Sequence, residues 1–429
     1  MYKKLSAPLV VQVELTEGCP NNCLHCYNFW RKEKKIKAKY LSQKHTEEII
    51  EKLAQRKIFH IIFTGGEPLL NKKSLFSGIE KCNNAGISVG INSSLIPISN
   101  IDAQKMKEMG ISLVLTSLMG PNAEIHDAIA QREGSFHETV RGIKILQNVG
   151  VPVDANIVIS KKNFSYLREI VHLAKELGFR HVNSTRAGCP GNCLDFSDLS
   201  LTTEEFRKYL DTLYVSGQEE GIPTSVLESY PLCGIKDADV YHAFTGRRCL
   251  AGITSMTISP EGFVRPCSHF DQSYGNLITE DLTTIWDRME EWRNGSLIPE
   301  TCRSCKALAF CGGGCRMEAK MINGSINAID PYAVPEDAEY ALSRLLSMEK
   351  NNTPMPNSFR VNPKVKMRKE DFGGIVFTGT RLSCYLNKDS FGWLEKLDRK
   401  KIYSIDDFST MPNTFFTFLQ KLYNKNALI

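Results

Sequence analysis

The stretch EGCPNNCLHCYN, residues 17–28, follows a short β-rich run and carries Cys19, Cys23 and Cys26 in one tight loop. Three thiolates from one loop suit three irons of a cubane iron–sulfur cluster and leave the fourth iron without a protein ligand. Structural zinc normally takes four protein ligands, and His25, the nearest further candidate, would have to crowd between Cys23 and Cys26. The stretch therefore predicts an iron–sulfur cluster with one open iron, and a zinc site is the alternative.

Outward from this loop, strand-like and helix-like segments alternate through the first half of the chain. The β-rich runs lie at residues 10–15, 59–63, 88–92, 112–118, 153–159 and 180–185. The segments with helical periodicity lie at residues 46–56, 72–85, 103–109, 135–149, 165–177 and 203–219. Glycines that allow a helix to end with a positive φ follow several of them, at Gly86, Gly110, Gly150, Gly178 and Gly221. Repeated strand–helix units predict an α/β fold with a parallel sheet, built as a complete or partial barrel or as an open doubly wound sheet.

The whole chain has 429 residues, which exceeds what one hydrophobic core usually supports, so two or three domains are expected. No apolar stretch approaches the roughly 20 residues that cross a bilayer, and residues 1–13 lack the features of a signal peptide. A net charge of +5 is too mild to indicate nucleic-acid or membrane binding over the whole surface. We therefore expect a cytoplasmic protein with no nucleic-acid partner and no membrane partner.

The cysteine content points to metal ligation rather than to disulfides, because fourteen cysteines occur in a chain for which we expect a reducing compartment. Six of them follow one another at metal-ligand spacings in a region of short strands and turns that begins near residue 230. These six are Cys249, Cys267, Cys302, Cys305, Cys311 and Cys315. They predict bound metal, either as iron–sulfur clusters or as two zinc knuckles.

The other cysteines are scattered. Cys189 and Cys193 flank a Pro-Gly-Asn turn after the sixth predicted strand, at the mouth of the expected barrel. They are candidate catalytic thiols or candidate metal ligands, and ordinary loop thiols are the alternative. Cys233 is a candidate for completing the cluster of Cys249. Cys82 and Cys384 are most simply core residues.

With Tyr27 and the run Gly65, Gly66, Glu67, Pro68 after the second strand, the first three cysteines resemble the radical S-adenosylmethionine (SAM) superfamily. That resemblance implies a partial (β/α)6 barrel and a 4Fe-4S cluster whose open iron chelates SAM. It also implies that one electron from the cluster releases a 5′-deoxyadenosyl radical. From the residues themselves, the glycines would let the backbone come close to a ligand, and the exposed edge of this run would meet the methionine amine.

The same resemblance implies further SAM contacts. Asn92, Ser94 and Ser117, at the ends of the third and fourth strands, are expected near the ribose, with cap or turn roles as the alternative. Arg132 is expected to serve the SAM carboxylate, because the family's arginine position is Ala130 here. Met119 stands where the related pattern has an acid.

The second cysteine set resembles the SPASM domain, a C-terminal extension of peptide-modifying radical SAM enzymes that binds one or two auxiliary iron–sulfur clusters. By that resemblance, Cys249, Cys267 and Cys315 serve one cluster, and Cys302, Cys305 and Cys311 serve the other. The family's pattern ends with a cysteine shortly after an Asp-Pro pair, whereas Asp330 and Pro331 lead here to Ala333. Asp330 could replace that ligand, the iron could stay open, or the cluster could be absent.

The C-terminal part follows a stretch rich in Asn, Pro and Ser at residues 349–359, which predicts a linker. A hairpin is expected from strands at 374–378 and 382–386 around Gly379, with helices at 390–397 and 413–423. Residues 360–429 resemble the PqqD-like fold that recognises leader peptides, and a winged-helix module for nucleic acid or dimer contacts is the alternative. A basic run at residues 31–39 is expected to be a solvated loop or a guide for an acidic peptide.

We expect four segments: a radical SAM core at 1–235, a SPASM domain at 236–348, a linker at 349–359 and a PqqD-like module at 360–429. The resemblance implies an oxidoreductase that matures a ribosomally synthesised peptide by abstracting hydrogen and forming a thioether or carbon–carbon crosslink. Its implied partners are a precursor peptide with a leader sequence and a reductant such as flavodoxin or ferredoxin. The alternatives are formylglycine formation of the sulfatase-maturase type, peptide epimerisation, and a non-catalytic electron carrier or peptide-binding scaffold.

Overall fold

The computed structural model describes residues 3–28, 37–188, 196–348, 354–379 and 381–429. The chain divides into two compact units, Met1–Ser347 and Met348–Ile429. The first unit contains the cysteine loop and the cysteine-rich segment together. The bounds expected at residues 235 and 236 stay a prediction, and both lie inside this unit.

A nine-stranded sheet in the order β7-β6-β5-β4-β3-β2-β1-β8-β9 organises the first unit. Its strands are β1 (Val10–Glu14), β2 (His60–Thr64), β3 (Ser88–Asn92), β4 (Leu113–Ser117), β5 (Val153–Ile159), β6 (Val182–Arg186), β7 (Thr224–Val226), β8 (Ser255–Ile258) and β9 (Val264–Arg265). All neighbours from β7 to β8 pair in parallel, and only β9 runs antiparallel, against β8. Strands that follow one another in space as in sequence indicate a barrel-type sheet, because a doubly wound sheet reverses its order part-way. The expected α/β partial barrel is therefore confirmed.

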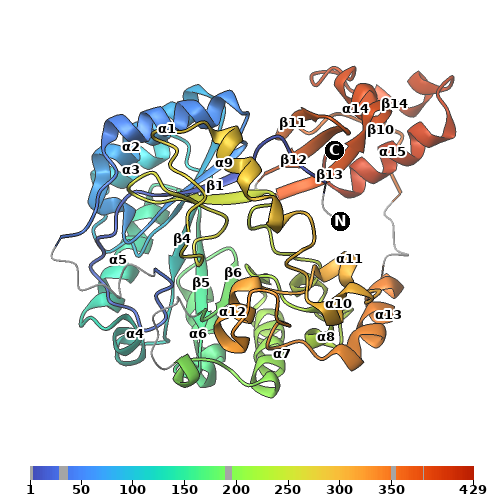
Figure 1. The fold of residues 1–429 in the computed structure, drawn as a ribbon. Helices are drawn as coiled ribbons and strands as arrows, with labels where there is room; N and C mark the ends of the chain where they lie inside the picture. Colours follow the sequence, from blue (N-terminus) through green and yellow to red (C-terminus); the bar gives the residue numbers. More distant parts are fainter. Residues whose placement is uncertain (1–2, 29–36, 189–195, 349–353, 380) are drawn as a thin grey trace. The chain divides into compact units, whose positions relative to one another are not determined.

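The helices that connect the strands lie on the outside of this curved sheet (Figure 1). They are α1 (Gln43–Gln55), α2 (Lys72–Asn84), α3 (Asn100–Glu108), α4 (Ala123–Ala130), α5 (Ser135–Asn148), α6 (Leu167–Glu176) and α7 (Thr203–Glu220). The glycine ends predicted for them are confirmed, as Gly86 has a φ of 68° and Gly221 has a φ of 61°. Helix α4 was not predicted. It is short, and the Asn122 side chain caps it by accepting a hydrogen bond from the backbone N–H of Ile125.

The cysteine-rich segment joins the same sheet instead of starting a separate one. Strand β8 pairs in parallel with β1, with Val10 opposite Ser255. A buried ion pair between Glu14 on β1 and Arg265 on β9 ties the two regions further. Burial raises the pKa of Glu14 to about 7 even though the Arg265 guanidinium opposes that shift. The loop that carries the first cysteines and the segment that carries the second set therefore start from neighbouring strands.

Short helices dominate the rest of the first unit. They are α8 (Leu232–Ile235), α9 (Leu282–Arg288), α10 (Glu300–Arg303), α11 (Leu308–Cys311), α12 (Arg316–Asn323) and α13 (Ala338–Met348). Single 3-10 turns are η2 (Pro68–Asn71), η3 (Phe164–Tyr166), η4 (Phe196–Asp198), η5 (His242–Phe244), η6 (Glu290–Trp292) and η7 (Pro335–Asp337). The indole N–H of the fully buried Trp286 on α9 donates to the carbonyl oxygen of Leu5, which fastens this segment to the start of the chain.

The second unit has its own core and its own sheets. A three-stranded antiparallel sheet runs β11-β12-β13, and a pair of short strands runs β10-β14. The elements are β10 (Ser358–Phe359), β11 (Val365–Glu370), β12 (Gly373–Thr378), β13 (Arg381–Asn387), α14 (Lys388–Glu395), β14 (Tyr403–Ser404), η8 (Ile405–Phe408) and α15 (Asn413–Asn424). Val376, Phe391, Phe415 and Leu419 belong to one buried cluster between sheet and helices. The expected hairpin and both helices are confirmed, and β11 adds a strand that was not predicted.

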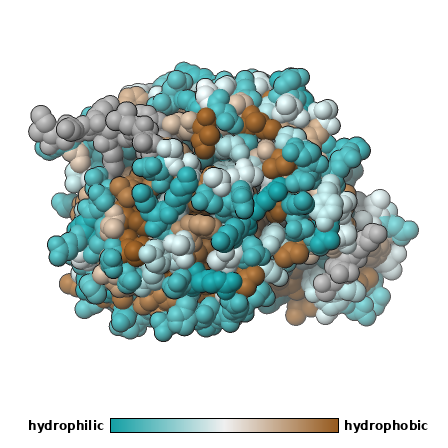
Figure 2. Space-filling view, turned by 90° about the horizontal axis from the view of Figure 1, so that it is seen from below, coloured by the Kyte–Doolittle hydropathy of each residue, from teal (hydrophilic) through white to brown (hydrophobic). Residues whose placement is uncertain are grey.

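Hydrophobic residues on the face drawn in Figure 2 form separate patches among hydrophilic ones. Among the described residues, no helix has the length and apolar character needed to cross a membrane.

Candidate iron–sulfur and cofactor site

The first three cysteines lie on the loop between β1 and α1, at the carboxyl end of β1, where barrel active sites are built. Cys19, Cys23 and Cys26 are all partly exposed, and a turn in which the Cys26 N–H donates to the Cys23 carbonyl (3.1 Å) folds the loop back. Two backbone hydrogen bonds fasten the loop to the end of α4: Asn22 N–H to Ala130 O at 3.0 Å, and Leu24 N–H to Ile129 O at 3.0 Å. The loop that carries the three thiols is thus fastened to the end of α4.

The glycines after β2 lie against the protein's own cysteine loop. A Cβ on Gly66 would lie 2.0 Å from the Gly18 carbonyl oxygen, and one on Gly65 would lie 2.5 Å from the Thr16 oxygen. Gly66 N–H also donates to Thr16 O, and Glu67 N–H to Gly18 O, both at 2.7 Å. The expected close approach of backbone is therefore made to the protein's own cysteine loop. Closeness of this run to a ligand stays a prediction.

The carboxylate of Glu67 is buried and fully engaged. It accepts hydrogen bonds from Ser93 Oγ (2.7 Å), from the backbone N–H (2.7 Å) and Oγ (2.6 Å) of Ser94, and from the Leu69 N–H (3.1 Å). Burial raises the pKa of Glu67, and these hydrogen bonds oppose the rise. Pro68 then starts the 3-10 turn η2. Glu67 and Ser94 thus join the ends of β2 and β3 to each other, which is a positioning contact.

Arg132 lies just after α4, beside the cysteine loop. Its Nη2 pairs with Glu138 Oε1 at 2.8 Å, while its Nη1 is buried with no hydrogen-bond partner. Asp127 accepts from the Gly134 and Phe136 N–H groups at 2.7 and 2.8 Å and so fixes the turn that carries Arg132. Buried guanidinium nitrogens normally have a partner, and the expected contact of Arg132 with the SAM carboxylate stays a prediction.

Three further expected contacts lie at the same edge of the sheet. Asn92 ends β3, and Ser117 ends β4, and both are half-buried. The ring of Tyr27 packs on the ring of His269 at 4.8 Å between centroids, so the first cysteine loop touches the segment that carries Cys267. Met119, where the related pattern has an acid, is buried in a small cluster with Ile129 against Cys23.

Cys249, Cys267 and Cys315, the first auxiliary group, are close enough to influence one another. Burial raises the pKa of Cys267 to about 11, and the Cys249 thiol adds to the rise. Burial likewise raises the pKa of Cys315, whose neighbours include Cys249. The backbone N–H of Cys315 donates to Asp330 Oδ2 at 2.7 Å. Asp330 is thereby used in holding this group.

Cys302, Cys305 and Cys311, the second auxiliary group, come from α10, the turn after it and the end of α11. Burial raises the pKa of Cys302, and the thiols of Cys311 and Cys305 contribute. Cys233 on α8 belongs beside this group: burial raises its pKa to about 12, and Cys311, Cys302 and Cys305 add to the rise. The structure therefore places Cys233 near the second auxiliary group, whereas the sequence favoured the cluster of Cys249.

A buried arginine that sequence reasoning missed lies between the two regions. Arg186, at the carboxyl end of β6, is 1% exposed and pairs with Asp330 Oδ2 at 3.1 Å. Its Nε lies 3.5 Å from Glu228 Oε2 and 3.9 Å from Glu318 Oε2. Burial raises the pKa of Glu228 to about 8 and that of Glu318 to about 7, against the effect of the guanidinium. No local pattern marks such a cluster, because its members come from distant parts of the chain.

Comparison with known proteins identifies the two cysteine regions. The model of the radical SAM superfamily matches residues 13–193, and that of an iron–sulfur cluster-binding domain called SPASM matches residues 249–306. The chain belongs to the radical SAM superfamily. It is a radical SAM enzyme with a SPASM domain, and its cofactors are SAM, a 4Fe-4S cluster and auxiliary iron–sulfur clusters.

Relatives of this radical SAM enzyme carry several names. An AdoMet-dependent heme synthase of Methanosarcina barkeri is 25% identical over 78% of this chain and 98% of its own length. The PqqA peptide cyclase of Rhizobium meliloti is 22% identical over 83% and 95%. The mycofactocin maturase MftC of Mycolicibacterium smegmatis is 28% identical over 77% and 83%.

Two solved structures share the fold. The enzyme anSMEcpe with bound AdoMet has a TM-score of 0.63 at 19% identity, covering 80% of this chain and all (100%) of that one. Streptococcus suis SuiB bound to its precursor peptide SuiA has a TM-score of 0.61 at 17% identity, covering 76% of each.

The residues of this radical SAM enzyme fit its cofactors. The three thiols of the cysteine loop are the ligand type that iron–sulfur clusters take. Besides Arg132 Nη1, buried Asn28 Oδ1 and Thr116 Oγ1 have no hydrogen-bond partner, and Asn28 Nδ2 donates to Gly65 O at 2.8 Å. Within the described part of the chain, no three His, Cys, Asp or Glu side chains converge as around a single metal ion. Thiols around a cubane stand farther apart, because the irons and sulfides lie between them.

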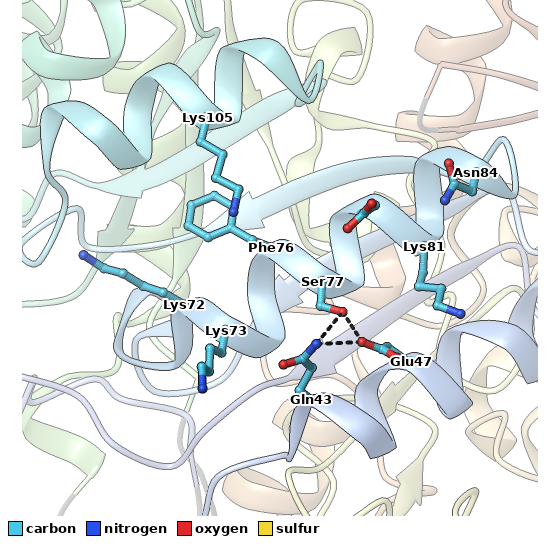
Figure 3. Close-up of a pocket in the computed structure, with 10 residues that line it drawn as sticks. Gln43, Glu47, Lys72, Lys73, Phe76, Ser77, Lys81, Asn84 and Lys105 are labelled. Carbon is cyan, nitrogen blue, oxygen red and sulfur yellow. Dashed lines mark hydrogen bonds between the residues drawn. The ribbon is translucent and has the colours of Figure 1, made fainter.

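A groove elsewhere on the radical SAM enzyme is separate from this site (Figure 3). It lies on the outer face of α1, α2 and α3, where Gln43 donates to Glu47 at 2.9 Å and Lys105 covers the Phe76 ring at 4.3 Å. Helix exteriors are remote from the carboxyl ends of the strands, so the groove is not part of the candidate site. Cys189, Cys193 and residues 31–36 of the basic run lie outside the described residues.

Proposed function

We propose that this radical SAM enzyme matures a ribosomally synthesised peptide, by abstracting hydrogen from a precursor and installing a thioether or carbon–carbon crosslink. The observation that carries the proposal is the second unit. It is a compact α+β module with its own core, and β11 and β13 are the outer strands of its three-stranded sheet. Such a module is dispensable for the radical site but suits recognition of an extended chain.

The second unit supports peptide recognition through main-chain pairing. An extended peptide adds a strand to a free sheet edge, so that backbone hydrogen bonds provide affinity and side-chain pockets provide specificity. Strand β11 also carries Lys366, Arg368 and Lys369, and Lys369 is exposed. A leader peptide with acidic residues would complement the exposed charge. In this proposal the unit is the PqqD-like module expected from the sequence.

The names of relatives support the same substrate class. The peptide cyclase and the mycofactocin maturase are named for peptide substrates, and SuiB is described with a precursor peptide. When bound, the clusters and SAM supply a 5′-deoxyadenosyl radical and an acceptor for the electron left behind. The residues of this chain then hold the reacting groups: Arg132 binds the SAM carboxylate, and Glu67 fixes the ends of β2 and β3.

The proposal includes a reductant such as flavodoxin or ferredoxin, since the cluster of Cys19, Cys23 and Cys26 needs an external electron. It also includes a cytoplasmic location, because a reducing compartment keeps the cysteines available as ligands.

A second candidate function is chemistry on a haem precursor. Among the relatives are AdoMet-dependent heme synthases, one of which is matched over 98% of its length. That similarity spans 78% of this chain, so about a fifth of the chain has no counterpart in that relative. We prefer the peptide proposal because the second unit is a compact module with its own core, and because a peptide cyclase and a mycofactocin maturase are also among the relatives.

The test incubates enzyme, SAM and reductant with the small peptide encoded beside its gene, and follows 5′-deoxyadenosine and peptide mass. A crosslink removes a pair of hydrogen atoms from the peptide. Epimerisation leaves the mass unchanged, and formylglycine leaves an aldehyde that reacts with a hydrazide. An unchanged, unepimerised peptide beside turnover of a haem precursor would replace the proposal with the second candidate.

A further inference from the structure

The second auxiliary group has three cysteines in its own segment, and the position at which the SPASM pattern has a fourth is Ala333. An alanine offers no ligand. Asp330, the nearest acid in sequence, is committed elsewhere: Oδ2 accepts from Cys315 N–H (2.7 Å) and Arg186 Nη2 (3.1 Å), and Oδ1 accepts from Tyr332 N–H (3.0 Å). Asp330 therefore holds the first auxiliary group and is not a replacement ligand for the second.

Helix α8 lies directly against the backbone at this position. A Cβ on Gly234 would stand 2.3 Å from the Tyr332 carbonyl oxygen, so the helix and residues 332–334 are in contact. The backbone of Val334, the residue after Ala333, is near enough to the Cys233 thiol to oppose the rise in its pKa that burial causes. Cys233 thus belongs to a helix that contacts the residue next to the place where the family's last cysteine would stand.

The surrounding contacts fix α8 in that place. Arg207 on α7 donates to the Gly234 carbonyl at 3.1 Å and to Asp337 Oδ2 at 2.6 Å, which joins α8 to the turn η7. Leu232, beside Cys233, shares a buried cluster with Ala307 and Cys311 of the second auxiliary group's segment. The other three thiols are near enough to act on the Cys233 thiol electrostatically. Cys233 is therefore brought to the group by tertiary packing and not by sequence spacing.

We propose that Cys233 is the fourth protein ligand of the second auxiliary cluster, in place of the cysteine missing at position 333. Four thiolates are the usual complement of a closed 4Fe-4S cluster, and each thiol loses its proton on binding iron. This cluster then has no open iron for a substrate, so its role is electron transfer. The assignment concerns cluster ligation alone and does not depend on which molecule the enzyme modifies.

The test uses the full chain with Cys19, Cys23 and Cys26 all changed to alanine, so that iron and spectra report the auxiliary clusters only. In this background Cys233→Ala should lose the iron of one cubane after anaerobic reconstitution, or show a changed electron paramagnetic resonance signal on reduction. Adding Ala333→Cys should restore the iron content and the signal, because residue 333 would then supply the fourth thiol in place of residue 233. Cys384→Ala, which changes a partly buried cysteine in the second unit, is the matched control and should change neither.

Cys233→Ser provides a conservative variant, since an oxygen ligand would keep the fold but alter the signal. Iron content and signal equal to the parent in Cys233→Ala would overturn the assignment. A loss in Cys233→Ala that Ala333→Cys does not reverse, together with an unaltered signal in Cys233→Ser, would also overturn it. Neither readout needs a peptide, so failure here is distinct from failure of the proposed function.

Discussion

Cys19, Cys23 and Cys26 lie on one loop after β1, and no other described cysteine lies on that loop. Changing all three to alanine should abolish the reductive cleavage of SAM, because alanine offers iron no ligand. The auxiliary groups lie on other elements, so their iron should remain bound. Anaerobic iron analysis and assay of 5′-deoxyadenosine measure both effects, and the parent should hold clearly more iron than one cubane contains.

Undiminished 5′-deoxyadenosine from the triple variant would contradict the assignment of the radical cluster. Finding zinc in place of the extra iron would instead indicate that the second cysteine set forms zinc knuckles.

Arg186 is the other single residue on which much depends. Removing one partner of a buried ion pair typically costs about 3–5 kcal/mol, because the remaining charge stays buried. Arg186→Gln should therefore lower the free energy of unfolding by about that amount and loosen Asp330, which holds Cys315. The midpoint of anaerobic urea unfolding is the measurement. Lys81→Gln, which breaks the exposed pair with Glu51, is the control and should change the midpoint little, because solvent screens that pair.

An Arg186→Gln midpoint equal to that of the Lys81→Gln variant would show that the buried cluster does not stabilise the fold.

Residues with local signals were predictable, and residues defined by packing were not. The cysteine ligands of a cluster that come from one loop have a characteristic spacing, so the sequence alone predicts them. The sequence favoured the cluster of Cys249 for Cys233, whereas the folded chain places Cys233 near the second auxiliary group. Sequence spacing could not show this, because α8 contacts residues near position 333 only in the folded chain. The sequence around Arg186 does not predict its buried ion pairs, because a single arginine at the end of a strand is common in proteins.

At the scale of elements, the end of β2 packs closely against the cysteine loop at Gly66. Alanine at this position would place its Cβ 2.0 Å from the Gly18 oxygen, which is a backbone atom that cannot rotate away. Such overpacking typically costs about 1–3 kcal/mol, and here it would be relieved by displacing the loop. Gly66→Ala should therefore reduce both the iron of the radical cluster and the cleavage of SAM.

Gly86→Ala separates this effect from backbone strain. Gly86 also needs an unusual backbone, with a φ of 68°, but its Cβ would meet nothing within 4 Å. The Gly86→Ala variant should lose about 1 kcal/mol of stability and should keep its iron. Equal iron content in the Gly66→Ala variant and the parent would remove the proposed coupling between strand end and loop.

The elements themselves were largely predictable where their patterns are long. All six expected strands of the core are present, because buried parallel strands are short apolar runs between glycine and polar turns. Helix α4 is short and depends on the Asn122 cap, so periodicity did not reveal it. The pairing of β8 with β1 was not predictable either, because local sequence patterns do not determine which strand a distant segment pairs with.

At the scale of the whole molecule, the chain has two compact units, and our proposal assigns radical chemistry to the first and peptide recognition to the second. Each has its own buried cluster, so the first unit should fold and retain its cofactor site when the second is removed. Deleting residues 352–429 should then weaken precursor binding by roughly ten-fold or more, because the sheet edge that pairs with the leader is gone. Cleavage of SAM in the absence of peptide should continue.

The comparison uses the neighbouring small peptide as ligand, with affinity measured by calorimetry or fluorescence anisotropy on full-length and truncated enzyme. Iron content and circular dichroism of the truncated form show whether the first unit is intact, so a folding defect is not mistaken for lost recognition. An intact truncated enzyme with full affinity would assign leader binding to the first unit. The second unit would then serve as a dimer contact or as a structural cap, and the peptide proposal would have to rest on the barrel and the auxiliary clusters alone.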